Sequence, residues 1–81
     1  MTREELYTEL TEVFREVFDD EEIEICDTTT ADDIEDWDSL EHINLVVAIE
    51  KKFSVRFNMG ETSKLKNVGE MADLILKKMG Q

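Results

Sequence analysis

The chain has 81 residues, enough for one domain with a modest core and too few for an enzyme with a deep, enclosed site. Aspartate and glutamate outnumber lysine and arginine by 21 to 9, which gives a formal net charge of -12 at pH 7. This charge repels nucleic acid and anionic membranes, and it favours protein partners that carry basic patches.

The first expected element is a helix over residues 3–18. Thr2 and Glu5 have the spacing of a capping box, in which each side chain accepts a hydrogen bond from the other residue's backbone N–H. Apolar residues then recur at helical spacing, which predicts one buried face. These residues are Leu6, Leu10, Val13, Phe14 and Val17.

Residues 19–37 are expected to form a long loop. Periodicity is absent there, and acids and threonines favour turns and caps over helix interiors. Ile23 and Ile25 alternate with glutamates as in a short strand, but no strong second strand is available to pair with it. Cys26 is the only cysteine, and we expect a half-buried packing residue rather than a reactive thiol.

A second helix is expected to begin at residues 38–41, whose sequence is Asp-Ser-Leu-Glu. Asp38 suits the N-cap, and Glu41 stands where it can return a bond to the helix start. Lys51 and Lys52 lie in the last turn, where cations complement the helix dipole. Its apolar surface is wider than one stripe, which favours packing against more than one neighbour. The apolar residues are Leu40, Ile43, Val46, Val47, Ile49 and Phe53.

The sequence pattern of the last third of the chain predicts one extended connection followed by two helices. The alternation at residues 53–57 favours an extended packed connection, and residues 61–65 allow at most one or two helical turns. Asn67 is the expected N-cap of a last amphipathic helix. Its apolar residues are Val68, Met71, Ala72, Ile75 and Met79. The predicted fold is all-α, a four-helix bundle with three longer helices, one short third helix and a long first loop, in one domain over residues 1–81.

An EF-hand calcium loop does not fit the acids at residues 32–38. Counting from Asp32, Ile34 occupies the third position and Trp37 stands where glycine is required. Weak divalent binding by a solvated acidic loop is left open, and no specific metal site is predicted. A calcium-responsive switch predicts a large structural change at micromolar calcium, which we do not expect.

A serine hydrolase is also disfavoured. Ser39 and His42 share a helix face, as a nucleophile and its base would. The chain nevertheless has no Gly-x-Ser-x-Gly motif and no glycine-rich oxyanion loop. We therefore expect His42 to be a partly exposed surface residue and Trp37 to be a core aromatic that closes the loop.

The setting of Ser39 resembles that of the acyl and peptidyl carrier proteins. These proteins share the motif Asp-Ser-Leu, present here as Asp38-Ser39-Leu40 at the start of the second predicted helix. The resemblance covers nearly the full chain, including the long acidic loop, the alternating segment at residues 53–57 and the short third helix. It implies that Ser39 accepts phosphopantetheine from coenzyme A through a separate magnesium-dependent phosphopantetheinyl transferase, and that the chain itself is not an enzyme.

The resemblance also implies a cargo and partners. The arm's thiol would hold an acyl group as a thioester for acyl-activating, acyltransferase or ketosynthase-type enzymes of fatty-acid, lipid or specialised metabolite biosynthesis. Basic patches on these enzymes would meet Asp38, Leu40, Glu41 and Glu50. Each buried CH₂ of the acyl chain is worth about 0.8 kcal/mol. The candidate lining residues are Val46, Val47, Phe53, Met71 and Ile75, although core packing is the alternative for each.

Some residues depart from the pattern of fatty-acid carriers. Asp36 and Trp37 stand where a glycine and a small residue are frequent, and His42 and Asn44 interrupt the acids of the second helix. These differences favour a specialised carrier. An aminoacyl or peptidyl carrier, including a D-alanyl carrier, would use the same serine. In a non-carrier acidic helical module, Ser39 would be only a helix-start residue.

The sequence also predicts a location. The longest apolar run, at residues 45–49, is far shorter than the roughly 18 residues of a membrane span. The N-terminus lacks the features of an export signal, which favours the cytoplasm. We expect a cytoplasmic monomer without nucleic-acid partners and without membrane insertion.

Overall fold

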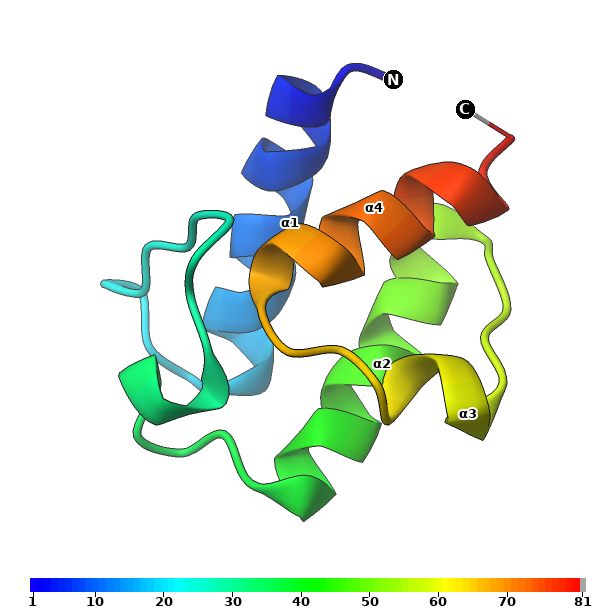
Figure 1. The fold of residues 1–81 in the computed structure, drawn as a ribbon. Coiled ribbons are helices and arrows are strands. Elements are labelled where there is room, and N and C mark those ends of the chain that lie inside the picture. Colours follow the sequence, from blue (N-terminus) through cyan, green and yellow to red (C-terminus); the bar gives the residue numbers. More distant parts are fainter. Residues whose placement is uncertain (81) are drawn as a thin grey trace.

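A computed structural model describes residues 1–80, which form a bundle of α-helices (Figure 1). No strand is present in this range. The elements are α1 (Arg3–Val17), the short 3₁₀ helix η1 (Ala31–Asp33), α2 (Ser39–Phe53), α3 (Met59–Thr62) and α4 (Val68–Lys78). The all-α prediction is confirmed, with three longer helices, one short helix and a long loop between α1 and α2. Gln81, the last residue of the predicted domain, lies outside the described residues.

The capping box predicted for α1 is present. Glu5 N–H donates to Thr2 Oγ1 at 3.1 Å, and Thr2 N–H donates to Glu5 Oε1 at 2.8 Å. The helix ends at Val17, one residue before the prediction, and Phe18 is its C-cap. Two donors that the first turn would leave unsatisfied are therefore bonded, which fixes where α1 begins.

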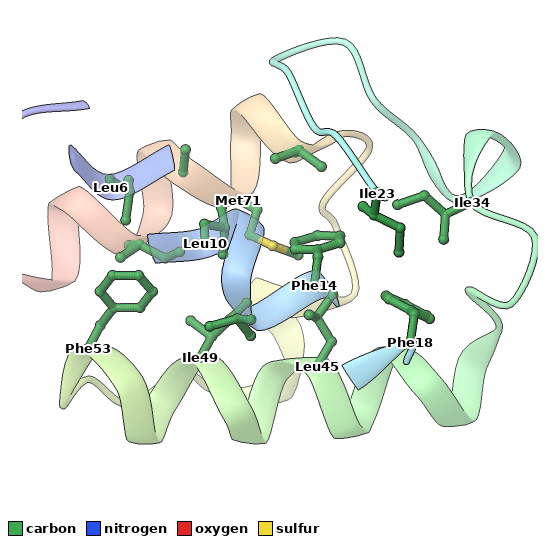
Figure 2. Packing of buried hydrophobic residues seen from close by; sticks show 14 of the residues in the cluster. Leu6, Leu10, Phe14, Phe18, Ile23, Ile34, Leu45, Ile49, Phe53 and Met71 are labelled. Atoms are coloured by element: carbon green, nitrogen blue, oxygen red, sulfur yellow. The ribbon is translucent and has the colours of Figure 1, made fainter. Parts of the chain in front are cut away.

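The core lies between α1, α2 and α4, and α1 packs against both of the other helices. Figure 2 shows Leu45, Ile49 and Phe53 of α2 pointing toward the buried side chains of α1. The long loop joins the same cluster through Ile23 and Ile34, which are buried beside Phe18. The remaining buried side chains come mainly from α1 and α4 and include Leu6, Leu10, Val13, Phe14, Val68, Met71, Ala72 and Ile75.

Part of the wide apolar surface of α2 is not packed. Leu40, Ile43 and Val47 are 65%, 58% and 44% exposed. These three side chains lie on the side of α2 opposite the buried Leu45, Ile49 and Phe53, and no element of residues 1–80 covers that side. The hydrophobic pattern shows which residues of the helix are apolar, but it does not show which side of the helix packs against another element.

Three further local features differ from the expectations. α3 begins at Met59, before the predicted range, because Asn58 forms a capping box with Glu61: Glu61 N–H donates to Asn58 Oδ1 at 2.8 Å. The helix η1 was not predicted, and the carboxylate of Asp33 accepts from Thr30 N–H at 2.9 Å there. Cys26 is exposed rather than half-buried, and hydrogen bonds from neighbouring threonine hydroxyls lower the pKa of its thiol.

A polar cluster ties the loop to α1 and α4. Arg3 donates to Asp27 at 2.8 Å and to Asp73 at 2.6 Å, and the Tyr7 hydroxyl also donates to Asp27. The hydrogen bonds from Tyr7 and Arg3 hold the pKa of the Asp27 carboxyl below its usual value. The loop backbone is bonded to α4 at the same place, because Gly69 N–H donates to the Asp27 carbonyl at 3.0 Å.

Replacement of Gly69 by alanine is expected to destabilise the fold. A Cβ atom there would stand 2.9 Å from the Asp27 carbonyl oxygen, so the loop backbone would have to move. We expect Gly69→Ala to lower the free energy of unfolding by about 1–3 kcal/mol, the cost typical of overpacking. This reverses the gain of up to about 1 kcal/mol that alanine ordinarily brings in a helix.

Gly60→Ala is the matched control, because its Cβ would meet nothing closer than 3.4 Å. It is expected to leave stability unchanged or slightly higher. Urea denaturation of both variants measures the difference. Equal stabilisation by both substitutions would show that the close approach at Gly69 is absent.

Candidate functional site

The site is built at the start of α2. Asp38 is the N-cap, as predicted: its carboxylate accepts from Glu41 N–H at 2.8 Å. The predicted return bond from Glu41 is not formed. The backbone N–H of Asp38 already donates to the Asp36 carbonyl at 3.1 Å, and the Glu41 carboxylate accepts from the Asn44 side chain instead. One side chain therefore sets the helix start immediately before Ser39.

Ser39 is the first residue of α2 and is exposed. Within residues 1–80, its hydroxyl and the backbone N–H groups of Ser39 and Leu40 have no hydrogen-bond partner. Free N–H groups at a helix N-terminus, together with the positive end of the helix dipole, favour an anion. Ser39 therefore presents an unengaged hydroxyl at a place suited to a phosphate group.

A cleft of about 470 Å³ opens beside Ser39, between the start of α2 and the segment that joins α3 to α4. Its walls carry both polar and apolar side chains. The lining residues are Ala31, Trp37, Asp38, Ser39, His42, Thr62, Ser63, Leu65, Lys66, Asn67 and Met71. A flexible chain attached at Ser39 would have a path along these walls.

Two side chains bridge one wall of this cleft to the other. Trp37 Nε1–H donates to His42 Nδ1 at 3.1 Å, and His42 Nε2 lies 3.2 Å from the Thr62 carbonyl oxygen. The Trp37 ring stacks on His42 and packs edge-on against Phe14 with ring centroids 5.3 Å apart. Trp37 closes the loop as predicted, and His42 is partly exposed as predicted. The bridge that they form with Thr62 was not predicted.

Sequence relatives identify the family. A family model described as a phosphopantetheine attachment site matches residues 8–75. The acyl carrier protein of Acidothermus cellulolyticus is 36% identical over 75 residues, which cover 93% of this chain and 89% of that protein. The chain belongs to the acyl carrier protein family. A second acyl carrier protein, from Petrotoga mobilis, is 32% identical over 80 residues, 98% of this chain and 93% of that protein.

The fold agrees with this assignment. The solution structure of the holo acyl carrier protein from Geobacter metallireducens superposes with a TM-score of 0.86 at 49% identity, over 91% of this chain and 85% of that one. The predicted family is thus confirmed, and the chain is a phosphopantetheine-bearing carrier rather than an enzyme. The aminoacyl carrier and the non-carrier helical module are not favoured by these relatives.

The residues around Ser39 fit the prosthetic group of the family. The unbonded N–H groups of Ser39 and Leu40 suit its phosphodiester, and the cleft offers both polar and apolar walls to the rest of the arm. Lys66 brings a cation to the same cleft. Phosphopantetheine supplies a terminal thiol, on which carriers of this family hold their cargo.

The residues predicted to line an acyl chain do not lie together in the structure. Met71 is on the cleft wall, whereas Phe53 and Ile75 are buried in the core, Val46 is half-buried and Val47 is exposed on the surface. Leu65, which the hydrophobic pattern did not indicate, lines the cleft opposite α2. The hydrophobic spacing of α2 and α4 predicts which of their residues are buried. It does not predict the cleft, because the segment between α3 and α4 forms one of its walls.

Of the residues predicted to contact partners, some are exposed and one is hydrogen-bonded within the chain. Asp38 and Leu40 are exposed beside Ser39, but Glu50 Oε2 accepts from the Phe57 N–H at 2.8 Å and holds the connection after α2. The bond joins residues seven apart, so local spacing did not reveal it. Lys51 and Arg56 are exposed near Glu50. The surface of α2 is therefore acidic near Ser39 and cationic at its far end.

Within the part of the chain that the structure describes, no group of three or more metal-ligating side chains lies close enough to hold an ion. Nor is any helix among these residues long and apolar enough to cross a membrane.

Divalent cations are expected to act only by relieving charge repulsion. Micromolar calcium should leave the circular dichroism spectrum unchanged, while millimolar calcium or magnesium should raise the melting temperature modestly because the net charge is -12. A thermal titration with both ions measures this. A calcium-selective transition at micromolar concentration would instead require a specific site.

Proposed function

We propose that this carrier bears phosphopantetheine on the Oγ of Ser39 and carries acyl groups as thioesters on the arm's thiol. The observation that supports this proposal is the unengaged hydroxyl of Ser39 at the N-terminus of α2, beside the cleft. The helix end favours the phosphodiester anion, and the exposed position gives a modifying enzyme access.

The other two serines have different surroundings. Ser54 is the C-cap of α2, at the negative end of the helix dipole, with φ 56°. Ser63 donates its hydroxyl hydrogen to the Gly60 carbonyl at the end of the four-residue α3. Only Ser39 combines a free hydroxyl with the N-terminal end of a long helix. This contrast supports Ser39 as the single acceptor.

The proposal extends to partners and setting. A phosphopantetheinyl transferase would load the chain, and acyl-activating, acyltransferase or ketosynthase-type enzymes would exchange its cargo. The exposed Asp38 and Leu40, with Glu41, support docking of a basic patch near the arm. We propose a specialised carrier acting as a cytoplasmic monomer, with one carrier domain over residues 1–81.

Transfer from octanoyl-coenzyme A tests the thioester function. A broad-specificity phosphopantetheinyl transferase with magnesium is expected to add one octanoyl-phosphopantetheinyl group, detected as intact mass. Neutral hydroxylamine should then remove the octanoyl group and leave the arm, since it cleaves thioesters. A chain loaded from coenzyme A alone should keep its mass under hydroxylamine. An octanoyl group that resists hydroxylamine would rule out the thioester.

Reversal of one charge on α2 tests the docking surface. Glu41→Lys is expected to lower kcat/KM for phosphopantetheine transfer several-fold at low salt, because docking charges mainly set the encounter rate. The loss should shrink as salt rises. Glu16→Lys, on the exposed side of α1, makes the same change in net charge and is the control. Equal effects of the two variants would attribute the loss to net charge alone.

A further inference from the structure

The Trp37–His42–Thr62 bridge defines the protonation state of His42. The indole N–H of Trp37 can only donate, so Nδ1 of His42 must accept its hydrogen bond. The backbone carbonyl of Thr62 can only accept, so Nε2 of His42 must carry a proton. Both bonds can therefore form only with the neutral imidazole, in the tautomer protonated at Nε2.

Protonation of His42 removes one side of the bridge. A proton on Nδ1 would face the Trp37 N–H across 3.1 Å, and two donors would then stand opposite each other with no acceptor between them. Nε2 would still donate to the Thr62 carbonyl. The Trp37 contact is thus the part of the bridge that depends on pH.

The bridge stands across the candidate site. Trp37 immediately precedes the N-cap of α2, His42 lies one turn after Ser39, and Thr62 ends α3. All three residues line the cleft beside Ser39. Trp37 is also packed against Phe14, so the same contact that shapes the cleft wall anchors the end of the long loop.

We propose that His42 is a positioning residue, which holds the cleft wall in place while neutral and releases Trp37 when protonated. The shape of the cleft beside Ser39 is then set by pH. This inference rests on the proposed attachment of the arm at Ser39, because only then does the cleft receive the arm. One hydrogen bond of this kind shifts an equilibrium between bridged and released forms by roughly 2- to 10-fold.

Charged side chains lie on each element that borders His42. They are Asp38 and Glu41 at the start of α2, Glu61 in α3 and Lys66 in the connection to α4. Carboxylates and lysines ordinarily keep their charge between about pH 6 and 8, whereas an imidazole ordinarily changes its charge there. His42 is the only histidine of the chain.

The indole N–H of Trp37 gives a direct test, because the chain has a single tryptophan and therefore a single indole cross-peak in a ¹⁵N–¹H spectrum. In the apo chain, this cross-peak is expected to move along a single titration curve as the pH is lowered from 8, together with the backbone amides of Ser63 and Leu65. In His42→Gln it should stay fixed. A cross-peak that does not move in the wild type, or that moves equally in His42→Gln, would overturn the proposal.

Two further variants keep the test decisive should His42→Gln fold poorly. Trp37→Phe keeps an aromatic ring but removes the donor, so the midpoint seen at Ser63 and Leu65 should move to higher pH by up to about 1 unit. Thr62→Ala keeps the backbone acceptor and should titrate as the wild type does. An unchanged midpoint in Trp37→Phe would contradict the bridge.

The titration is measured without a transferase, so it is independent of the attachment site. A normal titration in a chain that gains no arm on Ser39 would reject the proposed function and leave the bridge. A fixed indole cross-peak in a chain that is loaded on Ser39 would reject the bridge alone.

Discussion

The Ser39→Ala chain is expected to gain no phosphopantetheinyl group under conditions that load the wild type completely. Alanine removes the only oxygen at the start of α2 that can form the phosphodiester. The substitution should leave the fold intact, because the N-cap bond comes from Asp38 and the Ser39 hydroxyl has no partner in residues 1–80. Intact mass after incubation with coenzyme A, magnesium and a broad-specificity transferase measures the effect.

The remaining serines supply matched controls. Ser54→Ala and Ser63→Ala should load as fully as the wild type, since neither hydroxyl lies at the N-terminus of a long helix. Circular dichroism should show the same helical content in all three variants. Loading of the Ser39→Ala chain would place the arm on another residue, and loss of loading in Ser63→Ala would point to the opposite wall of the cleft.

Phe14→Ala is expected to cause the largest loss of stability. Phe14 is fully buried and contacts both Phe18 and Trp37, with ring centroids 6.0 and 5.3 Å apart. Removing a buried phenyl ring typically costs about 3–5 kcal/mol, because the cavity collapses only in part. A small domain has a total stability of about 5–15 kcal/mol, so this variant should approach unfolding. Urea denaturation followed by circular dichroism measures the loss.

Two variants make this prediction decisive. Phe14→Leu keeps most of the apolar volume and gives a smaller, measurable loss if Phe14→Ala does not fold. Val47→Ala, at an exposed apolar position of α2, is the control and should change stability by less than about 0.5 kcal/mol. Equal losses at Phe14 and Val47 would contradict the position of the core.

Features set by neighbouring residues were predictable from the sequence. The capping box of Thr2 with Glu5 and the N-cap at Asp38 depend on groups three residues apart, and both are present. Periodicity located α1, α2 and α4 to within about one residue at their beginnings, because one face of each helix is buried. The motif around Ser39 pointed to the family, which the relatives confirm.

Features that join distant segments were not predictable in the same way. Thr62 accepts from His42 through its backbone carbonyl, so the identity of residue 62 gives no signal for the bridge. The close approach of Gly69 to Asp27 joins residues 42 apart, and a helical pattern does not reveal it. The exposure of Val47 depends on which side of α2 the other helices cover, which tertiary packing decides and periodicity does not.

The most direct test of the carrier assignment is to find where phosphopantetheine is attached on the wild-type chain. The folded, unmodified protein is incubated with coenzyme A, magnesium and a broad-specificity phosphopantetheinyl transferase, and the product is digested and fragmented in a mass spectrometer. We predict one phosphopantetheinyl group per chain, on the peptide that contains Ser39 and on that residue. A folded chain that gains no group, or gains it on another residue, would contradict the account.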